Sequence, residues 1–399
     1  MNASIQKQQG LSLIEILIAM VISLVLLAGV VNIMRSSKYA YNTQTDLSQL
    51  QQSARIALSI LGKDLRMVGY FGCSSVPPSN TPADFQILAG RDDEGAAANH
   101  SDVLRLSFLE TGQNAFSIMH CPPYEPYGKD LVSFGGNTPY DSIDKYEDDC
   151  SPIRDGAPLT ETPFRVGRGS STDKLKYTEV GHDDARFAYP GSGDIDVDDQ
   201  VVVSDCGSGQ IYTVNSLTGG MELELLGSGS SGLIRTYDNK GMSYGAELRR
   251  INTYRYFVGS IIENGETRFS LCRDQQALGA TLSCSINAQD NGDVEELIEG
   301  VESMQLLYAV NTAAVGVPFS VRYLTATEID TLNLWNKVQA VRVSLLMRTL
   351  DERFNALEPD TNTYNNLDPQ FADDGYGPPN DHRLRRLVST TIKLRNWGQ

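Results

Sequence analysis

The stretch Gly10–Met34, GLSLIEILIAMVISLVLLAGVVNIM, decides the fold of this chain. From Leu11 onward it is apolar, and it is long enough to cross roughly 30 Å of hydrocarbon as a helix. A single ionisable residue, Glu15, interrupts the run. A carboxylate at such a position costs about 2.5–3.5 kcal/mol on insertion scales and indicates function by default. The stretch therefore predicts a membrane helix in which Glu15 does more than anchor the chain.

An ordinary membrane anchor or an uncleaved secretory signal is the alternative interpretation. A secretory signal has its small-residue cleavage site after the apolar core. Here Gly10 stands before the core, no Ala-x-Ala site follows it, and the leader Met1–Gly10 is polar with Lys7 as its only charge. These features argue against both alternatives.

Gly10, Leu11 and Glu15 together resemble the class III signal of type IV pilins and pseudopilins. The resemblance implies that a prepilin peptidase cuts after Gly10 and methylates the amine of Leu11. It also implies that Glu15 pairs with the N-terminal amine of a neighbouring subunit, since opposite charges stabilise each other in a low-dielectric bundle and fix register. We therefore expect a leader at residues 1–10 and a transmembrane, assembly half of the helix at residues 11–34.

The helical period continues beyond the membrane run, which predicts an amphipathic second half at residues 35–69. The apolar residues recur at spacings of three and four: Leu47, Leu50, Ala54, Ala57, Leu61, Leu65 and Val68. Charged residues such as Lys63 and Asp64 fall largely outside this face, and Gly69 stands where a C-terminal cap is expected. The polar segment Ser36–Thr45 leaves open a break between two helices.

Residues 70–399 change to strand and turn patterns, so the predicted fold class is α+β: a long N-terminal helix packed on antiparallel sheet, with an enlarged β-rich region. Asn264-Gly265 is the strongest hairpin signal in the chain. Pro122–Pro190 is predicted to form long surface loops, and Gly227–Gly232 is either a connection between two lobes or a hairpin tip. The expected strands lie at 103–109, 200–205, 210–214, 221–226, 247–262, 266–273, 297–310, 338–347 and 386–394.

Several short motifs narrow the resemblance to the PilW family of minor pilins, and they span most of the chain in the order of that family. They are the helix exit Asp64–Cys73, Val202–Cys206, Glu299–Tyr308, Trp335 with Val338–Met347, and Asp381–Asn396. Nothing in Pro122–Pro190 matches the family. The resemblance implies a role in priming pilus assembly at the inner membrane and then at the fibre tip, in twitching motility and adhesion.

The charge balance and the cysteines fit an extracytoplasmic protein. Asp plus Glu number 50 against 33 for Lys plus Arg, for a net charge of −17. That acidity argues against a nucleic-acid-binding surface, which needs a basic patch. Six cysteines beyond a membrane anchor favour disulfides over a metal site, because no Cys-x-x-Cys spacing occurs. The disulfide candidates are Cys73, Cys121, Cys150, Cys206, Cys272 and Cys284, and Cys272 with Cys284 is the favoured pair because a hairpin brings them together.

The sequence gives only weak evidence for a metal site or a catalytic site. Asp194, Asp196 and Asp198 have the spacing of the first calcium-loop ligands, but the glycine and glutamate that complete such a loop are missing. A solvated acidic turn is the simpler interpretation. The histidines His100, His120, His182 and His382 stand without a partner motif, and no hydrolase, zinc-protease or phosphate-loop signature occurs. We therefore expect neither an enzyme nor a cofactor.

The basic cluster around Arg383, Arg385 and Arg386 is expected to form salt bridges, with docking of an acidic partner as the alternative.

The sequence thus predicts a minor pilin whose partners are other minor pilins, the major pilin, the prepilin peptidase, the inner-membrane assembly machinery and, as one option, a tip adhesin. It is expected to span the inner membrane once, with residues 70–399 in the periplasm before assembly and at the cell surface afterwards. One alternative is a minor pseudopilin of a type II secretion system, for which a calcium site is more typical. Another is a membrane-anchored periplasmic enzyme or binding protein, in which Glu15 has no assembly role.

Overall fold

A computed structural model describes most of the long helix and the sheets of this chain. The described residues are 13–72, 85–93, 101–109, 116–119, 164–166, 173–177, 199–204, 209–218, 222–226, 246–263, 266–275, 282–284, 294–311, 321–352, 358–365 and 375–397. The predicted lobe boundary at 227–232 lies outside them, as do residues 1–12.

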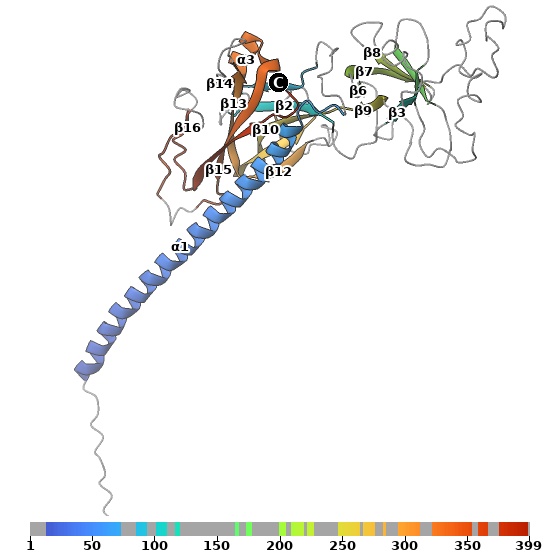
Figure 1. Ribbon diagram of the computed structural model, residues 1–399. Coiled ribbons are helices and arrows are strands. Elements are labelled where there is room, and N and C mark those ends of the chain that lie inside the picture. The colour runs from blue at the N-terminus through green and yellow to red at the C-terminus, as the bar shows by residue number, and fades with distance from the viewer. Residues whose placement is uncertain are drawn as a thin grey trace, which may run out of the picture.

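Helix α1, Leu13–Met67, is one continuous helix of 55 residues, about 82 Å long. Figure 1 shows its first half projecting away from the globular part of the chain. The break considered at Ser36–Thr45 is absent, because this segment holds neither proline nor glycine and its polar residues are tolerated within a helix. The helix stops at Gly69, as predicted: its φ is +73°, and an added Cβ would lie 2.9 Å from the carbonyl oxygen of Asn396.

The second half of α1 buries the face that its apolar period predicts. Leu50, Ala54, Ala57, Leu61 and Leu65 are all buried, and Val68 follows them into the same core. The prediction was wrong for Leu47, which is 37% exposed, because it follows the buried Asp46 by one residue and so points to another side of the helix. It was also wrong for Asp64, which is buried among the apolar residues.

Two antiparallel sheets pack against this half of the helix. The first is five-stranded in the order β1-β2-β10-β11-β12, and the second is four-stranded in the order β14-β13-β15-β18. Their strands are β1 (Leu88–Arg91), β2 (Val103–Phe108), β10 (Asn252–Glu263), β11 (Glu266–Asp274), β12 (Glu295–Glu299), β13 (Val301–Asn311), β14 (Val321–Leu324), β15 (Val338–Arg348) and β18 (Arg385–Lys393). The shared core lies between α1 and these sheets.

A closed barrel interrupts the first sheet between two neighbouring strands. Phe108 of β2 pairs directly with Asn252 of β10, and the barrel is formed from the chain between them. Its order is β3-β4-β5-β8-β7-β6-β9, with β3 (Phe116–Met119), β4 (Phe164–Val166), β5 (Asp173–Tyr177), β6 (Gln200–Ser204), β7 (Gly209–Thr218), β8 (Glu222–Leu226) and β9 (Ala246–Arg250). In Figure 1 it lies beyond the end of α1 that is farthest from the apolar half.

Small elements complete the described fold. Helix α3 (Ala326–Leu332) and the 3-10 turn η3 (Trp335–Lys337) join β14 to β15, while β16 (Tyr364–Asn365) pairs with β17 (Gly375–Tyr376) between β15 and β18. The sequence analysis missed α3, although Thr325 and Glu328 form a capping box at its start.

The predicted strands are mostly present, and the Asn264-Gly265 hairpin is confirmed by the pairing of Glu263 with Glu266. Two predicted strands are each divided in two. The 247–262 strand is β9 plus β10, which belong to different sheets, and the 297–310 strand is β12 plus β13, separated at Gly300 with φ +84°. An added Cβ on Gly300 would lie 2.8 Å from the carbonyl oxygen of Arg348, so this corner requires glycine.

Two further expectations need correction. The Pro122–Pro190 segment contains β4 and β5, so it is not loop throughout, because strand pairing within the barrel supplies partners that its turn-rich composition hides. Strand β2 is buried on both faces apart from the partly exposed Arg105, not half-buried, since α1 covers one side and other strands cover the opposite side.

Candidate functional site

The apolar half of α1 is fully exposed in the isolated chain. Its large apolar side chains, from Leu13 to Met34, are all exposed, and this is the one described helix long and apolar enough to cross a membrane. Twenty-two residues at 1.5 Å each span about 33 Å, which matches a bilayer core. Glu15 lies in the first described turn of this exposed surface. The predicted processing residues Gly10 and Leu11 lie outside the described residues.

A buried polar contact holds the other half of α1 on the first sheet. The hydroxyl of Tyr256, on β10, donates a hydrogen bond to Oδ2 of Asp64. Nη1 of Arg273, on β11, lies 3.4 Å from the same oxygen, and its Nη2 donates to Glu295 at 2.6 Å. The guanidinium also stacks over Tyr254 at 4.4 Å. We call Asp64, Tyr256 and Arg273 the helix latch.

Electrostatics keep the latch in its hydrogen-bonding form. Burial raises the pKa of Tyr256, and the adjacent Asp64 carboxylate raises it further, so the phenol stays a donor. Burial acts to lower the pKa of Arg273, but its hydrogen bonds to Tyr256 and Glu295 outweigh that effect and raise the pKa above its ordinary value. The latch therefore pairs one buried carboxylate with two reliable donors.

A groove of about 410 Å³ opens where α1 leaves the sheets. Residues of α1 between Asp46 and Ile56 form one wall, Leu297–Glu299 of β12 another, and Arg348–Asp351 at the end of β15 the third. Both apolar and charged side chains line it. The groove lies on the same helix as the exposed apolar half, at the point where the globular part begins.

A second buried ionic group joins the two strands β13 and β18. Arg385 donates to Glu302 from Nε at 2.6 Å and from Nη2 at 2.9 Å, and it donates to Asp381 at 2.5 and 2.6 Å. Its Nη1 also reaches Asp360 at 3.3 Å, and Arg348 donates to Glu302 at 3.2 Å. The side chains of Arg385 and Glu302 are wholly buried. We call this group the carboxylate clamp.

The contacts of the clamp decide between the two interpretations of the basic cluster, which were salt bridges and docking of an acidic partner. Arg385 is used in salt bridges, and Arg383 lies near Glu352 and Asp381 at 3.6 and 3.9 Å. Arg386 is exposed on β18. The salt-bridge interpretation is therefore the better one for Arg383 and Arg385, which are unavailable for docking an acidic partner.

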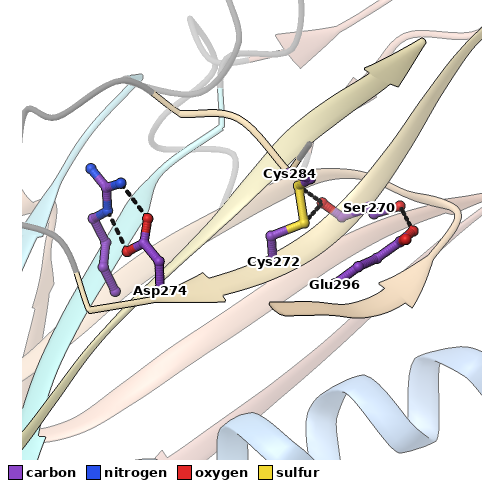
Figure 2. The surroundings of a disulfide bond; sticks show 6 residues. Ser270, Cys272, Asp274, Cys284 and Glu296 are labelled. Carbon is purple, nitrogen blue, oxygen red and sulfur yellow. Dashed lines mark hydrogen bonds and ion pairs between the residues drawn. A yellow bond between two sulfur atoms is a disulfide. The ribbon is translucent and has the colours of Figure 1, made fainter. Parts of the chain in front are cut away.

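Cys272 and Cys284 are joined by a disulfide, which is the pairing favoured from the sequence (Figure 2). Both cysteines are buried, and Cys284 packs on Gly259 of β10, where an added Cβ would lie 2.4 Å from its sulfur. Nearby, Ser270 donates to Glu296 at 2.6 Å, and Arg255 donates to Asp274 from Nε at 2.9 Å. The bond ties the segment 282–284 to β11. Cys73, Cys121, Cys150 and Cys206 lie outside the described residues.

The remaining predicted candidates are not brought together by the described fold. Asp194, Asp196 and Asp198 lie outside the described residues, as do His100, His120 and His182. Among the residues that are described, no group of three or more His, Cys, Asp or Glu side chains is placed to hold a metal ion. His382 lies beside the clamp residue Asp381 in sequence and is half-buried.

Sequence reasoning missed the paired polar groups of the interior. Asp64, Tyr256 and Arg273 come from distant parts of the chain, and so do Glu302 and Arg385. The one available signal was the position of Asp64, which is three residues after Leu61 and therefore on the edge of the buried helical face. Its partners follow only from the strand register.

Comparisons with known proteins match two regions of the chain. Residues 256–396 match the family model described as Type IV Pilus-assembly protein W (PilW), and residues 5–31 match the prokaryotic N-terminal methylation motif. No curated protein matches. Among solved structures, a type IV-like pilin from Thermus thermophilus matches at 17% identity, covering 50% of this chain and 85% of that chain, with a TM-score of 0.20. The two family matches confirm the resemblances found in the sequence.

Proposed function

We propose that this chain is a PilW-type, minor-pilin-like protein that primes type IV pilus assembly and then occupies the fibre tip, because residues 256–396 match the PilW family model and residues 5–31 match the N-terminal methylation motif. In this role it joins other minor pilins in the inner membrane and supports addition of the major pilin. Twitching motility and adhesion depend on the resulting fibre, with a tip adhesin as a further partner. The PilW match favours the pilus over type II secretion.

The proposed processing follows from the methylation motif. Prepilin peptidase removes residues 1–10 by cutting after Gly10, and Leu11 becomes the methylated N-terminus. Residues 11–34 then span the inner membrane, residues 35–69 carry the helix into the globular part, and residues 70–399 lie in the periplasm. The assembly machinery moves the subunit from this position into the fibre at the cell surface.

One observation carries the proposal: α1 is a single helix whose first half is exposed and mostly apolar with Glu15 as its only charged residue, while one face of its second half is buried against the sheets. A helix exposed in this way needs lipid or other helices around it. Glu15 then needs a positive partner in that setting, and the free amine of a neighbouring subunit supplies one. A rigid connection through the helix latch carries the globular part along with the helix.

Glu15→Leu tests the assembly role. We expect the variant to fold, to insert and to be cleaved after Gly10, but to lower the number of pili per cell, because the neighbour's amine loses its counter-charge. Electron microscopy counts the pili, and N-terminal sequencing checks the start at methylated Leu11. Asn32→Leu, which also removes a polar group from the apolar half, is the matched control and should leave piliation unchanged. Normal piliation of Glu15→Leu would contradict the assembly role.

Cleavage itself is tested separately. The intact mass of the protein from native membranes should correspond to a chain starting at methylated Leu11 when prepilin peptidase is present and at Met1 when it is absent. A start at Met1 in both cases would show that the chain is only anchored, and a role as a periplasmic binding protein would replace the pilin role.

A further inference from the structure

The short stretch of α1 between its apolar half and the sheets has an unusual composition. Within seven residues after Met34 stand Arg35, Lys38, Tyr39 and Tyr41, and Asp46 is the first buried position of the helix. Arg35 and Lys38 are exposed, and neither forms an ion pair with any residue that the structure describes. Tyr39 is 38% exposed and Tyr41 is 70% exposed. We call these four residues the collar.

The height of the collar is set by the helix. With Leu13–Met34 filling the hydrocarbon core, Arg35 stands at its edge and Tyr41 about 9 Å above it. The headgroup region of a bilayer is about 5–8 Å thick on each side. Arg35 and Lys38 therefore fall at the depth of the lipid phosphates, Tyr39 lies within the interface that amphipathic aromatic rings prefer, and Tyr41 lies just beyond it.

The orientation of the collar is set by the helical period. Arg35, Tyr39, Asn42, Asp46 and Leu50 recur at spacings of three and four, so they share one side of α1. Asp46 and Leu50 on that side are buried against the sheets. Arg35 and Tyr39 of the collar therefore lie on the side of α1 that carries the globular part, between that part and the membrane surface.

The charges of the collar determine which class of lipid it favours. The protein carries a net charge of −17, so an anionic membrane surface repels most of it. Arg35 and Lys38 are the cations closest to the headgroups. We propose that they bind the phosphates of anionic phospholipids in the periplasmic leaflet, with Tyr39 packed at headgroup depth, and so hold the subunit at a fixed height before assembly. The inference rests on the membrane-inserted state in the proposed function.

The test uses the full-length chain in nanodiscs that contain equal amounts of phosphatidylcholine and phosphatidylglycerol. Native mass spectrometry after release counts the lipids that stay bound. We expect the wild-type chain to retain phosphatidylglycerol preferentially. Arg35→Gln with Lys38→Gln should lower that preference by up to about 30-fold, which corresponds to about 1 kcal/mol for each basic residue at the surface.

Arg55→Gln with Lys63→Gln is the matched control, since both residues are exposed on the same helix but lie above the membrane. It removes the same charge and should leave lipid preference unchanged. Equal retention of the two lipids by the wild-type chain, or an equal loss in the control, would overturn the inference. The assay involves no pilus, so a failure of Glu15→Leu to alter piliation and a failure of lipid preference are distinguishable.

Discussion

Asp64 is the residue on which the attachment of the helix depends. It is a carboxylate buried among leucines and alanines of α1, and burial of an unpaired charge is costly. Tyr256 and Arg273 provide its donors from two neighbouring strands of one sheet. This arrangement fixes the position of α1 on the first sheet, because a shift of the helix by one turn would leave the Asp64 carboxylate without either donor.

Tyr256→Phe should lower the free energy of unfolding by roughly 1–3 kcal/mol, because it removes the closer donor to a buried carboxylate. Urea denaturation followed by circular dichroism measures the change. Tyr323→Phe on β14 removes a hydroxyl while keeping the ring over which Arg342 stacks, so it should change stability little. Equal stability of the two variants would show that the latch hydroxyl contributes nothing.

The elements β13 and β18 are joined by more than backbone pairing to β15. The carboxylate clamp links Glu302 of β13 to Arg385 of β18, and through Asp360 and Asp381 it closes the base of the excursion that contains β16 and β17. Backbone hydrogen bonds between Asp360 and Asp381 and between Asn380 and Asp360 close the same base. One arginine thus positions a whole loop.

Arg385→Gln should destabilise the fold by about 3–5 kcal/mol, since it leaves Glu302 buried beside too little positive charge. Hydrogen exchange should quicken first at residues 358–365 and 375–381. The neighbouring Arg386→Gln removes an exposed arginine from the same strand and should alter stability by about 0.5 kcal/mol or less. Protection of these residues in Arg385→Gln equal to that in the wild type would refute the clamp.

Acidic pH should weaken the carboxylate clamp and so lower the stability of the fold. Burial acts to raise the pKa of Asp381, but the hydrogen bonds and charge of Arg385 outweigh it and hold the pKa below its ordinary value. A carboxyl with a lowered folded-state pKa stabilises the fold above its unfolded-state pKa, and that stability is lost as the pH falls through the folded-state value. Stability should therefore fall below about pH 4. In Asp381→Asn, urea midpoints measured from pH 6 to pH 2 should decline less steeply, and an unchanged slope would contradict the assignment.

At the scale of the whole molecule, we call α1 with the two antiparallel sheets the body. The chain passes from β2 into the barrel and returns from it to β10, and these two strands are paired neighbours in the first sheet. It is not isolated from the body, because Val202 and Ile211 pack in the same core as Phe71 and Leu109 beyond the end of α1. The PilW match begins at residue 256, after the barrel. The body thus holds the helix and the matched region, and the barrel lies outside that match.

Replacing residues 110–250 with Asn-Gly tests this division, because a two-residue turn suits the paired ends of β2 and β10. The variant also carries Cys73→Ser, which avoids leaving an odd cysteine. We expect it to keep the Cys272–Cys284 disulfide and to support piliation, with stability lowered by the loss of Val202 and Ile211 from the core. Mass mapping and pilus counts are the measurements. Complete loss of the disulfide would show that the body does not fold without the barrel.

The sequence by itself determined the parts whose cause is local. A run of apolar residues with one carboxylate specifies an exposed membrane helix with Glu15 in it, and the period of three and four specifies which face of α1 is buried. Asn264-Gly265 specifies its hairpin because its backbone preference matches the turn. The methylation motif and the PilW resemblance are likewise read from contiguous residues.

Only the tertiary structure decided the rest, because strand neighbours are chosen by pairing over long sequence distances. The closure of the barrel, the split at Ile251 between two sheets, and the partners of Asp64 and Arg385 all depend on such pairings. A buried ion pair has no sequence signature, since its members become neighbours only after the core has formed. The helix was therefore predictable from the chain, and what holds it to the sheets was not.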